Sequence, residues 1–266
     1  MIIRRIALAL SVCAVLASPA VAQPPRPAMT WQVDWGDQFC TLVRNPSDPS
    51  ALIVAARTVP GSRSAALRIL HRRGGGLPDR TNNVVLLPSG QSFEVGGDPE
   101  VLQNGQRVLG LYPLPRSFWD ALAGASELQL RRGDQVLDRF ALTNTAAAVR
   151  ALRQCASDAM REWGIDEAAL GRIRQLPQPL NHYGLDSVDY PQAAMRERVG
   201  GRMLIRVAVS VDGRATECRT VATSGDVLLD RAACPTILRF GRFTPAIDVD
   251  GQNVGATYVA TIRWVP

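Results

Sequence analysis

The chain has 266 residues, of which 46% are hydrophobic and 20% are charged. This composition is normal for globular proteins and supplies enough apolar material for one large or two modest domains, which excludes wholesale disorder. The formal net charge is +6 and is carried by arginine, because the sequence contains no lysine. This small excess of positive charge argues against nucleic-acid binding, and the basic residues are not interleaved with aromatic residues.

The first 22 residues have the layout of a secretory signal. A basic start, MIIRR, precedes an apolar run of about a dozen residues, and Ala20 and Ala22 provide an A-x-A cleavage site. A membrane-spanning helix needs about 20 apolar residues, and Ser18-Pro19 ends this run short of that length. We therefore expect cleavage after Ala22 and a periplasmic protein without a membrane span. An uncleaved membrane anchor is the alternative.

Residues 29–163 are predicted to form a β-rich domain that is closed by a helix. The stretch WQVDWGDQFCTLVR, which reaches Cys40, alternates apolar and polar residues and is interpreted as one strand. Three further strand candidates follow, separated by clusters of glycine, proline and asparagine: SALIVAART, SAALRILHR and NNVVLLP. A short helix in PRSFWDALAGA and a hairpin around Arg132-Gly133-Asp134 complete the β-rich part.

The closing helix is expected in TNTAAAVRALRQCASDAMREWG, where alanine dominates and the apolar residues share one stripe. Thr143 or Asn144 can provide its N-cap, and Gly164 can end it. Residues 164–187 are then expected to form a connector, with a short helix in IDEAALGRIR and an extended segment in LPQPLNHYG.

Four cysteines remain after Cys13 leaves with the signal: Cys40, Cys155, Cys218 and Cys234. An even number in an oxidising compartment favours disulfides, and the absence of a C-x-x-C motif argues against a zinc site or a thioredoxin-type pair. Cys40 lies in the first predicted strand and Cys155 in the closing helix, so a bond between them would tie the two ends of the domain together. Two separate buried thiols are the alternative.

The last third of the chain predicts a strand, a tight turn and a return strand. Apolar residues alternate with residues such as Arg206 and Ser210, which indicates one buried face. The apolar residues are Met203, Ile205, Val207, Val209 and Val211. A two-residue turn at Asp212-Gly213 would set Val211 opposite Arg214, Val209 opposite Thr216 and Val207 opposite Cys218. Cys218 is therefore expected to point toward the apolar face.

A helix that follows the turn Ser224-Gly225-Asp226 is expected to cover this face, with Asp226 as its cap. The residues at helical spacing are Leu229, Ala232, Ala233, Thr236, Ile237 and Phe240. Cys234 lies on this helix, so a bond to Cys218 would join helix and sheet. Pro235 lies mid-helix and lacks a backbone donor, so we expect a kink or two short pieces.

The chain ends in a long alternating strand, which gives the module a β-β-α-β order. The apolar side of this strand is predicted at Val254, Ala256, Tyr258, Ala260, Ile262 and Trp264. The predicted fold class is α+β, with a β-rich N-terminal domain closed by a helix and this smaller C-terminal module.

The C-terminal module resembles the TonB C-terminal domain family over about residues 188–266. The motifs that carry the resemblance are YP at Tyr190-Pro191, Gly201 before the alternating strand, DGR at Asp212–Arg214, LLDRAA at Leu228–Ala233, FTPA at Phe243–Ala246 and DGQ before the closing strand. Each motif is weak alone, but their order and spacing together are specific.

The resemblance implies an exported, non-enzymatic protein linked to transmembrane transport. Proteins of this family reach outer-membrane transporters and capture a short extended peptide, the TonB box, as a strand added to a sheet edge. The expected binding edge is the closing strand, at Val254, Gly255, Ala256, Thr257, Tyr258, Val259, Ala260, Thr261 and Ile262. Homodimer pairing through this edge and a purely structural edge are the alternatives.

Two alternative functions remain open at this point. The first is a membrane-anchored TonB energy transducer with an uncleaved N-terminal segment, although the long proline-rich spacer of such proteins is replaced here by a domain. The second is an envelope enzyme that acts through residues 29–163.

No catalytic, cofactor or metal site is predicted. The two histidines, His71 and His182, have no Cys, Asp or Glu at ligand spacing. Asp34 and Asp37 lie near two tryptophans and could be imagined as a carboxylate pair, but an amphipathic strand with its tryptophans in the core is favoured.

Overall fold

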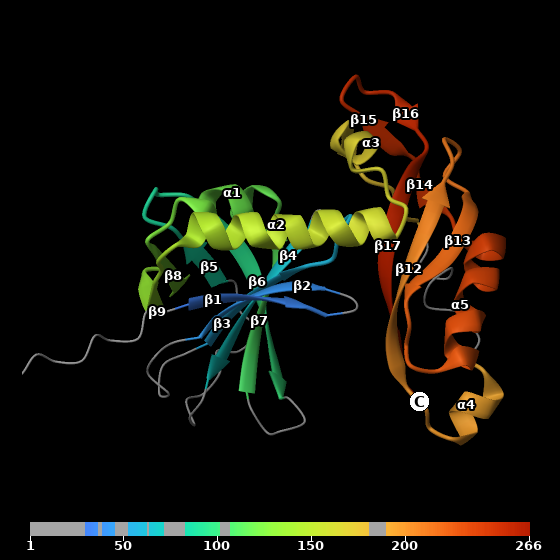
Figure 1. Cartoon of the computed structure of the whole chain (residues 1–266), viewed down its shortest axis with the longest axis horizontal. Helices are drawn as coiled ribbons and strands as arrows, with labels where there is room; N and C mark the ends of the chain where they lie inside the picture. Colours follow the sequence, from blue (N-terminus) through green and yellow to red (C-terminus); the bar gives the residue numbers. More distant parts are fainter. Residues whose placement is uncertain are drawn as a thin grey trace, which may run out of the picture.

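The computed structural model describes residues 30–36, 39–45, 53–62, 64–71, 83–101, 107–180 and 190–266. The predicted signal, residues 1–22, lies outside these ranges, as do Asp37 and His182. The fold is α+β, with a nine-stranded N-terminal sheet and a three-stranded C-terminal sheet (Figure 1). Within the described ranges, none of the helices has the length and apolarity that crossing a membrane requires.

The N-terminal sheet is antiparallel, with the strand order β1-β2-β3-β4-β7-β6-β5-β8-β9. Its strands are β1 (Thr30–Trp35), β2 (Cys40–Asn45), β3 (Ile53–Thr58), β4 (Ser64–His71), β5 (Asn83–Leu86), β6 (Ser92–Val101), β7 (Arg107–Pro115), β8 (Glu127–Arg132) and β9 (Gln135–Ala141). Helices α1 (Ser117–Ala123) and α2 (Thr145–Glu162) lie along one face of this sheet (Figure 1).

Helix α2 closes the N-terminal core, as its alanine-rich apolar stripe predicts. Leu152 and Cys155 are buried in one cluster with Leu42 and Leu67 of the sheet. A disulfide joins Cys40 of β2 to Cys155 of α2, with a Cα–Cα distance of 6.0 Å. The expected bond across this domain is therefore present in the structure.

The stretch WQVDWGDQFCTLVR forms two strands and not one. Strands β1 and β2 pair as a hairpin in which Trp35 lies opposite Cys40. Alternation continues through both arms of a hairpin, so it does not reveal where the chain reverses. Trp31 packs against the core, and its indole Nε1 donates to the Thr143 carbonyl at 2.6 Å.

In the N-terminal sheet, β6 and β7 lie in stretches where no strand was expected from the sequence. Both contain residues that usually interrupt strands, such as Gly96, Pro99 and Pro113. They nevertheless pair with each other, and β7 also pairs with β4 at the centre of the sheet.

The N-terminus of α2 is formed differently from the predicted cap. Asn144 occupies the N-cap position in the left-handed conformation, with φ of 56°, and its side chain makes no capping bond. Thr145 anchors this end instead, because its buried hydroxyl donates to the carbonyls of Ala123 at 3.1 Å and Ala125 at 2.9 Å. Gly164, with φ of 66°, follows the last turn as expected.

The C-terminal unit has the predicted β-β-α-β order. Strands β12 (Gly201–Val209), β13 (Ala215–Ala222) and β17 (Ala256–Trp264) form a sheet in the order β13-β12-β17. Helix α5 (Val227–Phe240) covers one face, and α4 (Gln192–Arg196) precedes β12. The buried residues of this core include Met203, Ile205, Val207, Leu229 and Ile237.

The hairpin between β12 and β13 confirms one predicted pair and corrects the others. Val207 lies opposite Cys218 as expected, but Val209 lies opposite Ala215 and not Thr216, because β13 bulges at this point. Val211 lies outside the strands and is 51% exposed. Gly213 is required at the turn, since a Cβ there would lie 2.0 Å from the carbonyl oxygen of Phe243.

Helix α5 is continuous through Pro235, so the expected division into two pieces is wrong. Its N-cap is Asp226, whose side chain accepts from the backbone amides of Leu228 and Leu229 at 2.9 and 3.1 Å. A disulfide joins Cys218 of β13 to Cys234 of α5 with a Cα–Cα distance of 5.3 Å. This bond fixes the helix to the sheet beside the proline.

Asp230, in the first turn of α5, holds the turn that precedes the helix. Its carboxylate accepts from the backbone amide of Ser224 at 2.8 Å and from the hydroxyl of Thr223 at 2.5 Å. Burial alone would raise the pKa of Asp230, but these hydrogen bonds and the Ser224 side chain outweigh it and lower the pKa below its ordinary value of 3.8.

The lowered pKa of Asp230 predicts an acid-sensitive contribution to stability. The charged carboxylate stabilises the fold above about pH 4, and this contribution is lost as the pH falls through the lowered pKa. Asp230→Asn is expected to lower the free energy of unfolding by about 1 kcal/mol at pH 7. The difference from the unsubstituted protein should shrink below pH 3 in urea unfolding.

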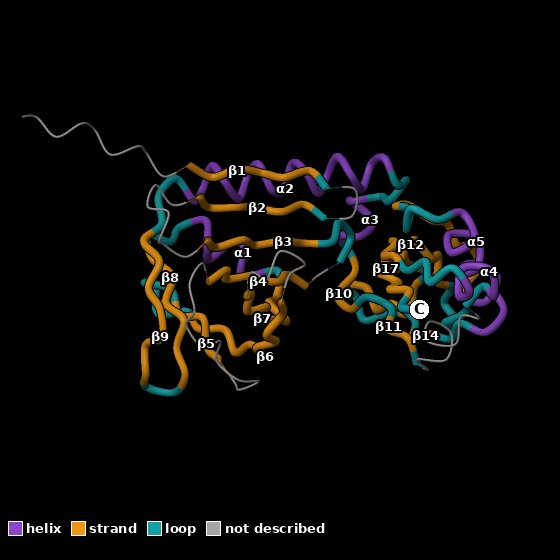
Figure 2. Tube along the Cα trace, turned by 90° about the horizontal axis from the view of Figure 1, so that it is seen from below, coloured by secondary structure: helices purple, strands orange, loops and turns teal. Residues whose placement is uncertain are grey.

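The connector is not a free linker, because parts of it pair with the C-terminal unit. Helix α3 (Glu167–Gly171) lies in the stretch expected to be a short helix, and Asp166 caps it. Strand β10 (Ile173–Gln175) pairs with β15 (Ala246–Asp248), which also pairs with β16 (Asn253–Val254). Strand β11 (Gln178–Pro179) pairs with β14 (Phe243–Thr244) (Figure 2).

The two units also share a buried interface on the face of the C-terminal sheet that α5 leaves open (Figure 1). The residues buried there are Met160, Trp163, Ile165, Leu204, Ala222 and Val259. Leu204 has no exposed surface, although the alternation along β12 assigns it to the polar side. Part of the second face of this sheet is therefore buried by the N-terminal half of the chain.

Candidate functional site

Strand β17 forms one edge of the C-terminal sheet. It pairs with β12 along its whole length, from Gly201 opposite Trp264 to Val209 opposite Ala256. Within the described residues, no other strand pairs with β17. A sheet edge of nine residues with one unpaired side is a surface on which another extended chain can add.

The contacts of β12 show which main-chain groups of β17 face outward. The Ser210 amide donates to the Arg214 carbonyl at 2.9 Å, and the Ala208 carbonyl accepts from the Thr216 hydroxyl at 3.2 Å. The main chain of Ala208 and Ser210 therefore faces β13. Because these groups alternate along a strand, Val207 and Val209 face β17.

Opposed residues of such a pair exchange both hydrogen bonds, which fixes the direction of each β17 residue. Tyr258 and Ala260, opposite Val207 and Ile205, direct their main-chain groups inward to β12. The alternate residues direct their amides and carbonyls to the open edge. These residues are Thr257, Val259, Thr261 and Arg263.

The side chains of β17 follow the same alternation. Tyr258, Ala260 and Ile262 lie on the α5 side, in the core of the C-terminal unit. Val259 lies on the opposite face, in the interface with the N-terminal half. Thr261 is exposed on that face. The edge residues with outward main-chain groups therefore also present their side chains toward the N-terminal half.

The turn between β3 and β4 packs directly against the middle of β17. A Cβ placed on Gly61 would lie 3.1 Å from Val259 Cγ2 and 3.3 Å from Ile165 Cδ1. Gly61 also has φ of 81°, a conformation that favours glycine. The β3–β4 turn thus packs closely against the edge strand at Val259, and the backbone conformation at position 61 disfavours a larger residue.

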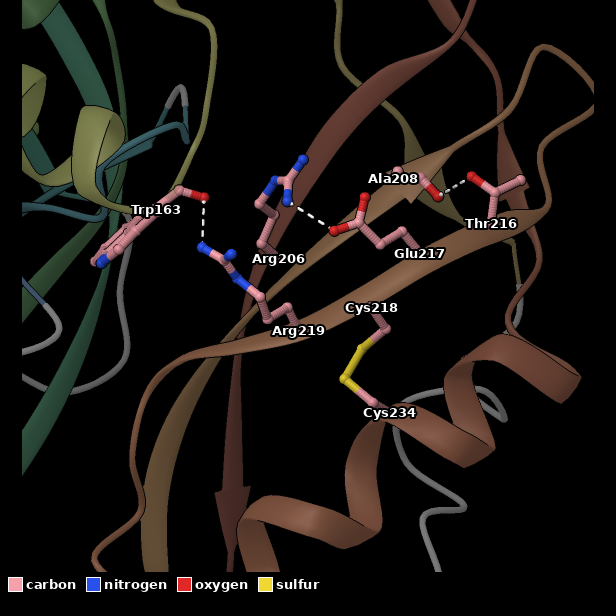
Figure 3. A network of polar contacts seen from close by, with 8 residues as sticks. All are labelled: Trp163, Arg206, Ala208, Thr216, Glu217, Cys218, Arg219 and Cys234. Atoms are coloured by element: carbon pink, nitrogen blue, oxygen red, sulfur yellow. Dashed lines mark hydrogen bonds and ion pairs between the residues drawn. A yellow bond between two sulfur atoms is a disulfide. The ribbon is translucent and has the colours of Figure 1, made fainter.

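Polar contacts on β12 and β13 lie beside the N-terminal half, and one of them joins the two halves (Figure 3). Arg219 donates through Nη2 to the Trp163 carbonyl at 3.1 Å, which joins β13 to the end of α2. Arg206 on β12 pairs with Glu217 on β13 at 3.0 Å. The Arg219 contact therefore joins the two halves at β13, away from the open edge of β17.

Tyr258 adds an uncharged aromatic group beside the edge. Its ring packs against Phe243 with a centroid distance of 5.3 Å, and burial raises the pKa of its hydroxyl above the ordinary value of 10.0. Tyr258 is therefore neutral throughout the physiological pH range, and we expect no contribution from this group to the pH dependence of binding.

Residues 186–266 match the family model described as Gram-negative bacterial TonB protein C-terminal. The C-terminal module is a TonB C-terminal domain. The match spans the sheet, α5 and the edge strand, and it begins two residues before the boundary expected from the motifs. No curated protein matches the chain.

The TonB C-terminal domain belongs to a transport-related, non-enzymatic family of the bacterial envelope, whose members interact with outer-membrane transporters. Its presence links this chain to transport. The family match does not extend to residues 1–185.

The structure places most of the predicted binding segment on the edge strand, with two differences. Val254 lies in β16, which pairs with β15, and Gly255 lies between the two strands. The segment on the open edge is therefore Ala256–Ile262. The sequence did not reveal this division, because apolar residues continue at every second position from Val254 to Ala256 although one strand ends and the next begins there.

The other residues considered from the sequence do not gather into a site. Asp34 is exposed on β1, while Asp37 and His182 lie outside the described ranges. In the part of the chain that the structure describes, no three His, Cys, Asp or Glu residues are arranged to hold a metal ion.

Proposed function

We propose that this protein is an exported, periplasmic TonB-like protein that binds peptides of outer-membrane transporters by β-strand addition along β17. The observation that carries the proposal is the outer side of β17, which no described strand pairs, in a domain of the TonB C-terminal family. The added strand would bond to the outward amides and carbonyls of Thr257, Val259 and Thr261.

Signal cleavage after Ala22 belongs to the same proposal. It is supported by the basic start, the short apolar run and the A-x-A motif. N-terminal sequencing of the exported protein tests it, with Gln23 as the expected first residue. An intact Met1 would contradict the proposal and favour a membrane-anchored transducer.

A proline substitution on the edge strand tests the peptide-binding proposal. Thr261→Pro removes an outward amide, and because the Thr261 side chain is exposed, the substitution leaves the packing of the domain unchanged. We expect affinity for a TonB-box peptide to fall at least about tenfold, since a strand hydrogen bond is lost and the proline ring enters the docking edge. Isothermal titration calorimetry on the full mature chain measures this change.

Thr261→Val is the matched control, because it alters the side chain and keeps the amide. It should bind the peptide as the unsubstituted protein does. Equal affinities of the proline and valine variants would show that the peptide does not use this edge. Sedimentation of the free protein separates the homodimer alternative, since pairing of two β17 edges predicts a dimer that Thr261→Pro dissociates.

A further inference from the structure

A cavity of about 140 Å³ lies in the N-terminal half, near the interface with the TonB C-terminal domain. The β3–β4 turn, α1, α2 and α3 all contribute to its walls. Its apolar lining includes Val59, Trp119, Leu152, Ala156, Met160 and Leu170. A cavity of this size holds a group about as large as a benzene ring, which is the size of one large apolar side chain.

The charges around the cavity balance and select no charged ligand. Arg153 forms an ion pair with Asp120. Glu167 accepts a hydrogen bond from Ser157 and lies with Arg116 in the lining. Both signs are therefore present at the rim, while the interior is apolar. This chemistry fits an uncharged side chain.

Some residues that line the cavity also support the part of β17 that faces the N-terminal half. Gly61 lines the cavity and also contacts the side chain of Val259. Met160 lines the cavity and is buried in the same interface cluster as Val259, and Leu170 lines the cavity and packs against that cluster. Gly61, Met160 and Leu170 thus line the cavity on one side and pack toward β17 on the other.

A strand added to β17 would direct one side chain toward this wall. Neighbouring strands lie about 4.8 Å apart, and directly opposed residues place their side chains on the same face of the sheet. The partner residue opposite Val259 would therefore point, like Val259, toward the β3–β4 turn at Gly61.

We infer that the cavity receives one large, uncharged apolar side chain, such as leucine, methionine or phenylalanine, from the partner strand at the position opposite Val259. This inference rests on the proposed strand addition and assigns a role to the N-terminal half. The edge of β17 supplies main-chain attachment, and the N-terminal half supplies selectivity for one side chain.

The test uses the full mature chain and a set of TonB-box peptides that differ at one central position. Burial of a large apolar side chain predicts that the leucine peptide binds about 10–100-fold more tightly than the alanine peptide. A peptide with aspartate at this position should bind no better than the alanine peptide. Equal affinities of the leucine, alanine and aspartate peptides would overturn the inference.

Two substitutions in the cavity wall test its location. Ala156→Leu fills the cavity and should reduce the preference for leucine over alanine to less than about threefold, with binding of the alanine peptide unchanged. Leu170→Ala enlarges the cavity and should shift the preference from leucine toward phenylalanine. Ala151→Leu, on an exposed position of the same helix, is the matched control and should alter neither preference.

The outcomes separate this inference from the proposed function. If Thr261→Pro weakens every peptide but no peptide shows a size preference, strand addition stands and the cavity assignment is wrong. If Ala156→Leu removes the size preference while Thr261→Pro has no effect, a peptide side chain enters the cavity but the peptide main chain does not lie along β17, which overturns both the strand-addition proposal and the position opposite Val259. If no peptide binds the unsubstituted protein, both are overturned.

Discussion

Replacement of Cys40 and Cys155 together by alanine is expected to lower the free energy of unfolding by about 4.8 kcal/mol. The bond closes a loop with a sequence separation of 115 residues, and the entropy that a cross-link removes from the unfolded chain grows with loop length. Both cysteines are buried, each 2% exposed, so the substitution also removes sulfur atoms from the core. Urea unfolding followed by tryptophan fluorescence measures the change.

The second disulfide provides the matched comparison. Cys218 and Cys234 are separated by 16 residues, so their joint replacement by alanine should cost only about 3 kcal/mol by the same relation. A larger loss from the second pair than from the first would show that chain entropy does not determine the order. In that case, local packing around α5 would be the dominant contribution.

Leu204→Ala is expected to cost about 3–5 kcal/mol and to loosen the contact between the two halves. Leu204 has no exposed surface and packs among Trp163, Ile165 and Val259, so truncation leaves a cavity at the centre of the interface. The amide of Ile165, which donates to the Met160 carbonyl at 2.8 Å, should exchange its hydrogen faster when this contact opens. Hydrogen exchange read by mass spectrometry checks this result.

Met203→Ala is the control, because Met203 is equally buried but lies on the opposite face of β12, against α5. It should destabilise the C-terminal core by a similar amount and leave exchange at Ile165 unchanged. Faster exchange at Ile165 in both variants would indicate that the two halves unfold as one cooperative unit.

Local patterns predicted much of the C-terminal domain. The alternation in β12, the turn at Gly213, the cap at Asp226 and the stripe on α5 each report a nearby contact. Such short-range features place Cys218 and Cys234 close together without knowledge of the rest of the chain. The bulge in β13, which places Val209 opposite Ala215, has no comparable signal in the sequence. It depends on how the two strands pack together.

The burial of Leu204 and Val259 could not be predicted, because their partners lie far away in the sequence. The alternation along β12 places Arg206 on one face of the sheet, and such a polar residue predicts that this face is exposed to solvent. In the structure, Met160 and Gly61 cover part of that face. The closing strand and its two faces were predicted from its alternation, and its role as a binding edge was predicted from the family resemblance. The cavity beside it requires the β3–β4 turn, α1, α2 and α3 to meet, which no single pattern describes.

Strands β6 and β7 show a further limit. Glycine and proline weaken isolated strands, so Gly96, Pro99 and Pro113 argue locally against a sheet. Pairing of β7 with both β4 and β6 overrides this local preference. Pro235 in α5 shows the same effect in a helix, where packing on the sheet and the adjacent disulfide keep the helix continuous.

The short strands of the connector can detach from the C-terminal unit and then link the two halves as an extended segment. The disulfides lock each folded unit from within, whereas β10 and β11 are attached to β15 and β14 by only a few main-chain bonds. A pull that opened the interface between the two halves would therefore detach residues 173–179 before it unfolded either disulfide-bonded core. Once detached, these residues would form an extended tether of roughly 23 Å between the two cores.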